Sequence, residues 1–193
     1  GHQIERIVAI LEPWYRQRDR HEKLVELYDR RLQRLDDSQA RFDLLEQAAE
    51  LSVAQLDAPA KAIDYYGAAL SERPEVESVA TRLRELAEQT ESWESVAGHF
   101  FEAIEDNDLD ERTSLQLWEH LADILDTHLG WMDDAEDAYR SILAIEPTHT
   151  EALEALDRIY RETGADALLA DVLERRIQAT NDPAVITELE LRR

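Results

Sequence analysis

The sequence predicts an all-α solenoid of about five helical hairpins, followed by the start of a sixth. The first observation behind this prediction is internal repetition, because the segments that begin at Ala62 and Ala135 share one pattern, 73 positions apart. The second is a composition with five Gly and five Pro in 193 residues, which leaves few helix breakers. The third is that no strand-like run of alternating Val, Ile and Thr occurs. Repetition at a fixed period is typical of stacked supersecondary units.

The repeat has an alternating length. Three further segments follow the same template and begin at Leu24, Val96 and Leu169. Each segment places an aromatic residue or Leu four positions on, as at Tyr28 and Phe100. The starts at 24, 62, 96, 135 and 169 are spaced by 38, 34, 39 and 34 residues. This alternation predicts a super-repeat of two unequal units.

Each template segment is expected to form the second helix of a hairpin, with an amphipathic first helix upstream of it. Turn signals separate the two helices at 57–59, 90–93, 130–133 and 163–164. The expected hairpins span residues 4–36, 42–74, 77–108, 114–147 and 150–181, and residues 183–193 begin the next helix. Pro13 predicts that the first helix kinks or ends there, with Trp14 and Tyr15 packing under the next helix.

The second helices resemble those of the tetratricopeptide repeat family. The residues that carry the resemblance are a small residue, an aromatic, a second small or aliphatic residue and a closing Pro: Ala62, Tyr66, Ala69 and Pro74, and again Ala135, Tyr139, Ile142 and Pro147. The first helices depart from the family pattern, with Glu46 and Glu119 in place of its early Trp. The opening Trp93-Glu-Ser-Val96 also resembles the degenerate paired arrays of large bacterial repeat proteins.

This resemblance implies a right-handed solenoid that binds a protein or peptide in a concave groove lined by the first helices. The groove residues that it implies come from the second to fifth hairpins and are Leu44, Gln47, Leu51, Gln55, Thr81, Glu85, Glu88, Leu117, His120, Ile124, His128, Glu154, Arg158 and Arg161. An extended or helical peptide with apolar anchors and basic residues suits such a surface. The alternative is that the Leu and Ile side chains pack against a neighbouring helix.

The charge of the chain restricts its partners. The formal net charge is −23, and residues 42–193 hold 12 basic against 36 acidic residues. Nucleic acid and anionic membrane surfaces are repelled by this field, whereas basic proteins are attracted. In co-chaperones of this family, Asn, Lys and Arg side chains of the groove bind the carboxylate of a peptide. Such a site is not expected here, because Asn107 and Asn181 lie in predicted loops and Lys61 lies on a second helix.

The chain contains no cysteine, which excludes disulfides and thiolate metal sites and favours a reducing, cytoplasmic compartment. No apolar run approaches the roughly 20 residues of a membrane-spanning helix. The opening Gly1-His2 resembles the remnant of a cleaved tag, so we expect a fragment of a larger protein.

No catalytic, cofactor or metal site is expected. His120 and His128 are eight residues apart and lack the His-Glu-x-x-His spacing of zinc enzymes. Asp106, Asp108 and Asp110 match the first ligand positions of a calcium-binding loop. The glycine and the last carboxylate that such a loop requires are replaced by Glu111 and Leu117, so a calcium site is not expected. Asp110 or Thr113 is instead expected to cap the following helix. Phosphate-binding Gly-rich loops and Ser nucleophile elbows are also missing from the sequence.

A second functional hypothesis is a structural spacer, or a rod that self-associates end to end. Apolar residues near both ends of the chain are its candidates: Ile4, Ile7, Val8 and Ile10, and Val185, Ile186 and Leu189. Trp118 and Trp131 lie outside the repeat template, so one of them is a candidate for an exposed anchor.

Overall fold

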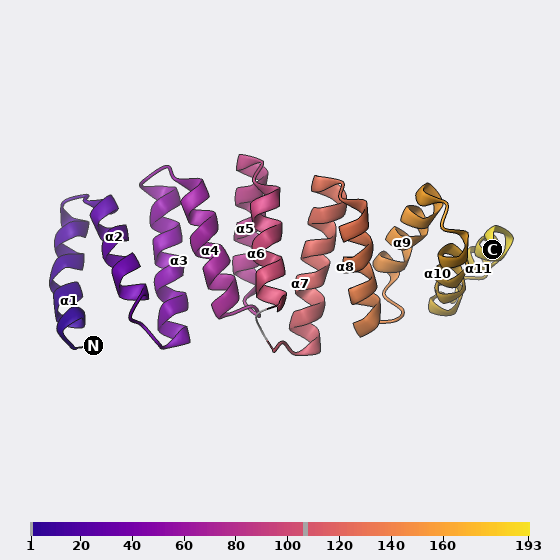
Figure 1. Ribbon diagram of the computed structural model, residues 1–193, viewed down its shortest axis with the longest axis horizontal. Coiled ribbons are helices and arrows are strands. Elements are labelled where there is room, and N and C mark those ends of the chain that lie inside the picture. The colour runs from indigo at the N-terminus through magenta and orange to yellow at the C-terminus, as the bar shows by residue number, and fades with distance from the viewer. Residues whose placement is uncertain (1, 106–107) are drawn as a thin grey trace. The chain divides into compact units, whose positions relative to one another are not determined.

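The computed structural model describes residues 2–105 and 108–193, with side chains from residue 7 onward. Within these ranges the chain is helical throughout, with eleven α-helices, one π-helix and no strand (Figure 1). The chain divides into two compact units, Gly1–Asn107 and Asp108–Arg193. The prediction of an all-α fold is confirmed, and a single array over residues 1–193 stays a prediction.

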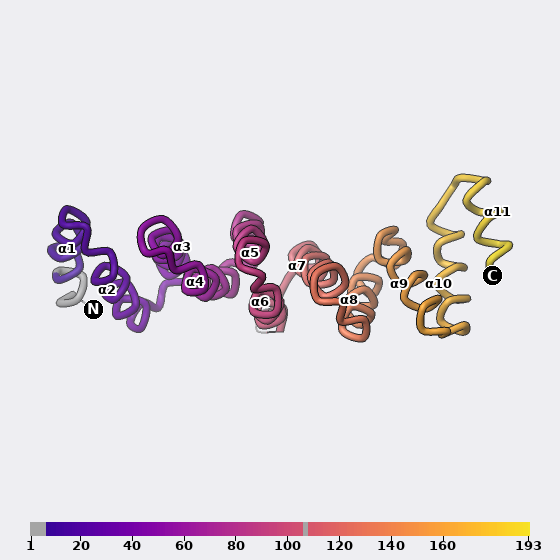
Figure 2. Tube along the Cα trace, turned by 90° about the horizontal axis from the view of Figure 1, so that it is seen from above, coloured from indigo at the N-terminus to yellow at the C-terminus, as the bar shows by residue number. Residues whose placement is uncertain are grey.

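The first unit consists of three helical hairpins. Their helices are α1 (His2–Gln17) and α2 (His21–Leu32), α3 (Ser38–Ala54) and α4 (Pro59–Glu72), and α5 (Glu77–Thr90) and α6 (Trp93–Glu105). Viewed close to end-on, α1, α3 and α5 form one row and α2, α4 and α6 form a second (Figure 2). The first helices of the hairpins therefore share one face of this unit.

The second unit contains two complete hairpins and one further helix. Its helices are α7 (Glu111–Asp123), the π-helix η1 (Ile124–Leu129), α8 (Met132–Ile145), α9 (Thr150–Thr163), α10 (Asp166–Ala179) and α11 (Pro183–Arg192). In neither unit is any described helix long and apolar enough to cross a membrane.

Local sequence signals set the helix ends. The carboxylate of Asp110 accepts from the backbone N–H groups of Arg112 and Thr113, both at 3.0 Å, and so caps α7 as expected. Asp37 and Asp182 cap α3 and α11 in the same way. These capping carboxylates satisfy backbone donors that have no partner within the helix.

The template positions of the second helices form the core. Ala62, Tyr66, Phe100 and Leu173 are all buried, and the ring of Tyr28 is buried between its neighbours. A helical hairpin cannot bury such a stripe alone, so each hairpin depends on the next one in its unit. The repeat pattern in the sequence is therefore a pattern of interhelical packing.

The first helix does not end at Pro13, and a kink at this residue stays a prediction. Pro13 lies inside α1, which continues to Gln17. Proline removes the hydrogen bond to the carbonyl of Ala9, but both residues are exposed, so water can satisfy that carbonyl. Trp14 is exposed rather than packed under the next helix, and the guanidinium of Arg18 lies 4.4 Å from its ring centroid.

The first helix of the fourth hairpin also differs from expectation. The apolar spacing of residues 114–128 predicts one α-helix over this range, whereas α7 ends at Asp123 and the chain continues as the π-helix η1. Gly130, with φ of 66°, then ends this segment. Because a π-helix has more residues per turn, the side chains after Asp123 take directions that a continuous α-helix does not give.

Candidate peptide-binding surface

Three of the predicted groove residues are buried. Leu44, Leu117 and Ile124 are 3%, 2% and 0% exposed, so they cannot contact a ligand in this structure. Their apolar stripes pack against neighbouring helices, which was the alternative interpretation of these positions. The other eleven predicted groove residues are exposed or half-buried.

Predicted residues of α3 converge on one depression in the first unit. Gln47, Leu51 and Gln55 line a hollow of about 210 Å³ between α1, α2 and α3, which we call the α1–α3 hollow. Its other lining residues are Arg16, Tyr28, Glu50 and Ala54. Apolar carbons of Leu51 and Ala54 thus lie beside two amides and a carboxylate.

A polar triad borders this hollow. The hydroxyl of Tyr28 donates to the carboxylate of Glu12 at 2.9 Å, and Arg16 donates to the same hydroxyl at 2.7 Å. Arg16 also pairs with Glu12 at 3.0 Å. Burial and the nearby carboxylate raise the pKa of Tyr28 to about 12. The triad therefore holds Arg16 and a neutral Tyr28 side chain at the edge of the hollow.

Glu50 of α3 lines the hollow, and Glu46 lies near it outside the lining. The pKa of Glu46 is raised, first by burial and then by the nearby carboxylates of Glu50 and Asp43. A raised carboxyl pKa means that negative charge is unfavourable at this position. A cationic group close to Glu50 would lower the electrostatic part of this effect, which is smaller than the part due to burial.

The predicted residues of α5 form an exposed polar strip. Thr81, Glu85 and Glu88 are all exposed. Glu85 pairs with Arg82 at 2.6 Å, and the hydroxyl of Thr81 donates to the carbonyl of Glu77 at 3.1 Å. These contacts are local to α5, and screening by water makes such exposed pairs weak.

The second unit has a hollow of the same size. Glu154, a predicted groove residue, lines about 210 Å³ of space between α9, α10 and α11, which we call the α9–α11 hollow. The remaining lining residues are Thr150, Leu153, Arg176, Ala179, Thr180, Val185 and Leu189. Two of these, Val185 and Leu189, were assigned from the sequence to the end of the array.

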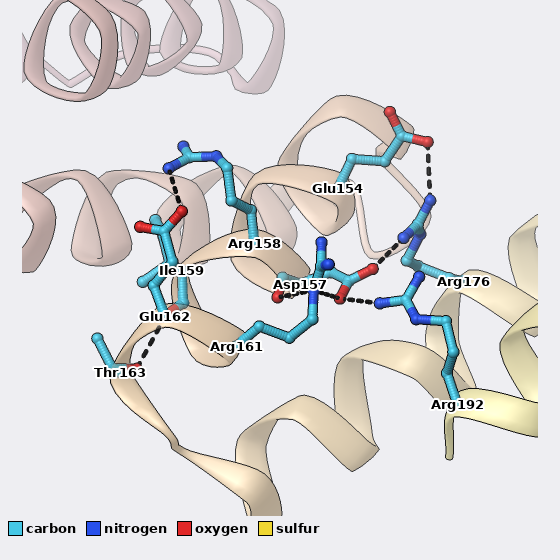
Figure 3. A network of polar contacts seen from close by, with 9 residues as sticks. All are labelled: Glu154, Asp157, Arg158, Ile159, Arg161, Glu162, Thr163, Arg176 and Arg192. Carbon is cyan, nitrogen blue, oxygen red and sulfur yellow. Dashed lines mark hydrogen bonds and ion pairs between the residues drawn. The ribbon is translucent and has the colours of Figure 1, made fainter.

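A buried carboxylate, that of Asp157, pairs with Arg176, which lines this hollow (Figure 3). The side chain of Asp157 is 1% exposed and forms ion pairs with Arg161 at 3.0 Å, with Arg176 and with Arg192. These arginines come from α9, α10 and α11. Arg176 also pairs with Glu154 at 2.8 Å. The predicted groove residue Arg161 thus belongs to an internal network.

The remaining predicted residues lie near the π-helix. Arg158 pairs with Asp126 of η1, and the hydroxyl of Tyr139 donates to the same carboxylate at 3.0 Å. Burial and this hydrogen bond raise the pKa of Tyr139. His120 is half-buried and His128 is exposed. Among the described residues, no group of three or more His, Cys, Asp or Glu side chains could hold a metal ion. Asp106 of the rejected calcium loop lies outside the described residues.

Sequence reasoning missed Arg16, Tyr28 and Arg176 as lining residues. The repeat position of Tyr28 predicts a core residue, and its side chain is indeed buried, but its hydroxyl contacts Glu12 and Arg16 at the edge of the hollow. The Glu12–Arg16 pair, four residues apart, is a signal that could have marked this edge. Nothing in the local sequence connects Arg176 with Asp157, because their contact depends on how α9 and α10 pack.

Comparisons with known proteins were made at the level of sequence and of structure. No family model matches the chain, and no curated protein matches it either. Among solved structures it is similar to YrrB, a TPR protein with an unusual peptide-binding site, at 18% identity over 93% of this chain and 88% of that chain, with a TM-score of 0.45. It is also similar to MamA, at 15% identity over 94% of this chain and 95% of that chain, with a TM-score of 0.46.

A third similar structure is BtubC (BKLC) from P. vanneervenii, at 19% identity over 96% of this chain and 79% of that chain, with a TM-score of 0.45. All three TM-scores lie below 0.5, so the fold assignment rests on the helical hairpins themselves.

Proposed function

We propose that this protein is a peptide-binding scaffold module and that the α1–α3 hollow is its binding site. One observation carries the proposal: Gln47, Leu51 and Gln55, predicted as groove residues, line a single hollow on one face of the first unit. Its volume of about 210 Å³ is smaller than the ~300–1,000 Å³ of typical small-molecule pockets. It therefore suits one anchoring side chain of a peptide. We propose a binding role and no catalytic one.

The lining residues define the chemistry of the ligand. Leu51 and Ala54 accept an apolar side chain, and the amides of Gln47 and Gln55 can hydrogen bond to the peptide backbone. Glu50 lines the hollow and lies near the carboxyl of Glu46, so a cation beside Glu50 is electrostatically favoured. We therefore propose a ligand with an apolar anchor flanked by lysine or arginine.

A display library of short random peptides, selected on the full chain, tests this proposal. We expect the selected peptides to share an apolar residue next to a basic one. Their binding should be lost in Leu51→Gln, which makes the apolar wall polar without adding charge. Val53→Gln is the matched control, because Val53 is an exposed apolar residue of the same helix that lies outside the hollow. Equal binding by both variants would place the site elsewhere.

The basic character of the ligand needs a separate test. Glu50→Gln removes a carboxylate from the hollow and should weaken a basic peptide, while leaving a peptide with neutral flanks unaffected. Binding of the basic peptide should also weaken as salt is raised, because exposed charges are screened. A ligand whose affinity is insensitive to both changes would contradict the proposed charge preference.

Self-association is a second candidate function, favoured by one observation on α1. Ile7, Ile10 and Trp14 are exposed and occupy positions i, i+3 and i+7, so they share one face of the helix. Val8 is buried, and Ile4 lies outside the described side chains. At the other end, Val185 and Ile186 are half-buried, Leu189 is buried and Leu191 is exposed. Light scattering measures the molar mass of the unmodified chain and of Ile10→Lys. If the exposed face of α1 mediates self-association, the unmodified chain should be a dimer and Ile10→Lys a monomer.

A further inference from the structure

Trp131 is an exposed aromatic side chain in the middle of the second unit. It is 41% exposed, whereas Trp118 is half-buried. Within residues 108–193 no other Trp, Tyr or Phe side chain is exposed. Tryptophan is enriched among the residues that carry the binding energy of protein interfaces. Of the two tryptophans outside the repeat template, Trp131 is therefore the candidate anchor.

The backbone holds Trp131 in place from both sides. Its N–H donates to the carbonyl of Leu125 at 2.9 Å, and its own carbonyl accepts from the N–H of Ala135 at 2.9 Å. Both Leu125 and Ala135 are buried. Because the residue is already ordered, less conformational entropy is lost when a partner binds to the indole.

The side chains next to the indole form what we call the Trp131 surface. Trp131, Met132, Asp133 and Asp134 line an open depression of about 450 Å³. Both carboxylates are exposed, and neither forms a hydrogen bond or ion pair with the residues that the structure describes. The first turn of α8 favours negative charge, which accounts for the two aspartates. It does not account for an exposed indole beside them.

Trp14 in the first unit shows how this chain covers another exposed indole. Trp14 is 45% exposed, and the guanidinium of Arg18 lies 4.4 Å from its ring centroid. Such a contact is stabilised by the attraction between a cation and the face of the ring. Among the described residues, no arginine or lysine lies over the ring of Trp131. The two tryptophans thus have similar exposure, but they differ in the cation that the chain supplies.

We propose that the Trp131 surface is a docking site for an arginine side chain of a basic partner protein. The guanidinium stacks on the indole, as that of Arg18 does on Trp14, and pairs with Asp133 or Asp134. Arginine suits this surface better than lysine, because its planar group stacks on aromatic rings and presents several N–H donors. The net charge of −23 attracts a basic partner and repels a second copy of this chain.

This surface is separate from the proposed peptide site. It belongs to the second unit and shares no residue with the α1–α3 hollow of the first. The experiments on Leu51 and Glu50 leave it unchanged. The two proposals can therefore fail independently.

The test follows the indole N–H signals of the full chain by heteronuclear NMR, which detects weak binding. Trp131→Phe identifies the signal of Trp131. The probe is a short peptide of alternating glycine and arginine, and its control contains citrulline, which is planar but uncharged, in place of arginine. We expect the arginine peptide to shift the Trp131 signal in a saturable way and the citrulline peptide to bind about tenfold more weakly. Equal binding of the two peptides, or no saturable shift with either, would overturn the proposal.

The signal of Trp14 serves as an internal control. It should shift little, because Arg18 already lies over that ring. Equal shifts at Trp14 and Trp131 would mean that the peptide is attracted to the acidic chain as a whole, and the site would be wrong. A lysine peptide should bind more weakly than the arginine peptide, and equal affinity would overturn the assignment to arginine.

The two carboxylates are tested by Asp133→Asn and Asp134→Asn, made separately. At least one of them should weaken the arginine peptide about threefold, as expected for the loss of an exposed ion pair. Asp166→Asn is the matched control, because Asp166 also lies in the first turn of a helix of this unit and is outside the Trp131 surface. If all three variants bind equally well, or are weakened equally, the carboxylates do not form the proposed site.

The ring itself is tested by Trp131→Leu, which keeps an apolar side chain at this position. Binding is then read from the backbone amide signals of Met132 and Asp133. We expect the saturable shift to disappear, because leucine offers no aromatic face to the guanidinium. Unchanged binding by this variant would overturn the role of the indole.

Discussion

The hydroxyl of Tyr139 donates to the carboxylate of Asp126 at 3.0 Å, and Arg158 pairs with the same carboxylate. Tyr28 makes the same kind of contact in the first unit, with Glu12 and Arg16. In both cases a tyrosine at the template position of a second helix reaches an acid–arginine pair outside its own helix. The aromatic ring packs among the helices, while the hydroxyl forms hydrogen bonds with polar side chains at the edge of the core.

Tyr139→Phe should lower the free energy of unfolding by about 1 kcal/mol, because it removes one hydrogen bond and keeps the ring. Asp126→Ala should cost more, since it leaves both the hydroxyl of Tyr139 and the guanidinium of Arg158 without this partner. Urea unfolding followed by circular dichroism measures both changes. An unchanged midpoint for Tyr139→Phe would show that water replaces the bond without loss.

Alkaline pH should reveal the tyrosine environments. Burial and nearby carboxylates raise the pKa values of Tyr28 and Tyr160 to about 12. These values lie above the ordinary tyrosine pKa of about 10. The neutral hydroxyls therefore contribute stability that is fully present below about pH 10 and is lost as the pH rises through 12. Phenolate absorbance during a pH titration measures this, and early ionisation of all tyrosines in the folded protein would contradict it.

Two glycines should respond in opposite directions to alanine. Gly67 is buried in α4, and a Cβ there would overlap the ring of His99. Gly67→Ala should therefore destabilise the first unit by about 1–3 kcal/mol. Gly98 lies on α6 with open space where a Cβ would lie, so Gly98→Ala should stabilise by about 0.5–1 kcal/mol.

Thermal unfolding compares the two glycine variants. His99→Ala combined with Gly67→Ala should recover part of the loss, because the overlap disappears. If Gly67→Ala and Gly98→Ala shift the midpoint in the same direction, the packing of α4 against α6 differs from this description.

Glu46→Gln should raise the melting temperature near neutral pH. The pKa of Glu46 is raised, so its neutral form is favoured in the folded state and its charge opposes folding above that pKa. The variant removes the charge, and its advantage should shrink as the pH falls toward about 4, where the native side chain is itself protonated. Glu77→Gln is a control on an exposed carboxylate of the same unit. An advantage that is the same at both pH values would contradict this account.

The alternating repeat length in the sequence has a visible structural basis. The first helix α3 has 17 residues, whereas α5 and α9 have 14 each. In the fourth hairpin, the 13 residues of α7 continue into the six residues of η1. The longer repeats are therefore those with longer first helices. The fold class and the turns could be predicted because the 3.6-residue period and the turn residues act locally.

The candidate site was only partly predictable. The helical template placed Gln47, Leu51 and Gln55 on one face, and the structure brings them to one hollow. The same template could not predict that Leu44 is buried whereas Leu51 lines the hollow, because periodicity does not tell which apolar residues a neighbouring helix covers. Ile124 was misplaced for the same reason, because it is an apolar residue at α-helical spacing that neighbouring helices cover completely.

Two first helices, α3 and the α7–η1 segment, are longer than α5 and α9, and this has a consequence for protein engineering. Repeat proteins are commonly lengthened or shortened by whole repeats, because each unit contacts only its neighbours. From α3 to α9 the native chain alternates long and short first helices, so removal of one hairpin within this range would place two long or two short ones in succession. The portion that can be deleted or duplicated without a new kind of junction is therefore two consecutive hairpins.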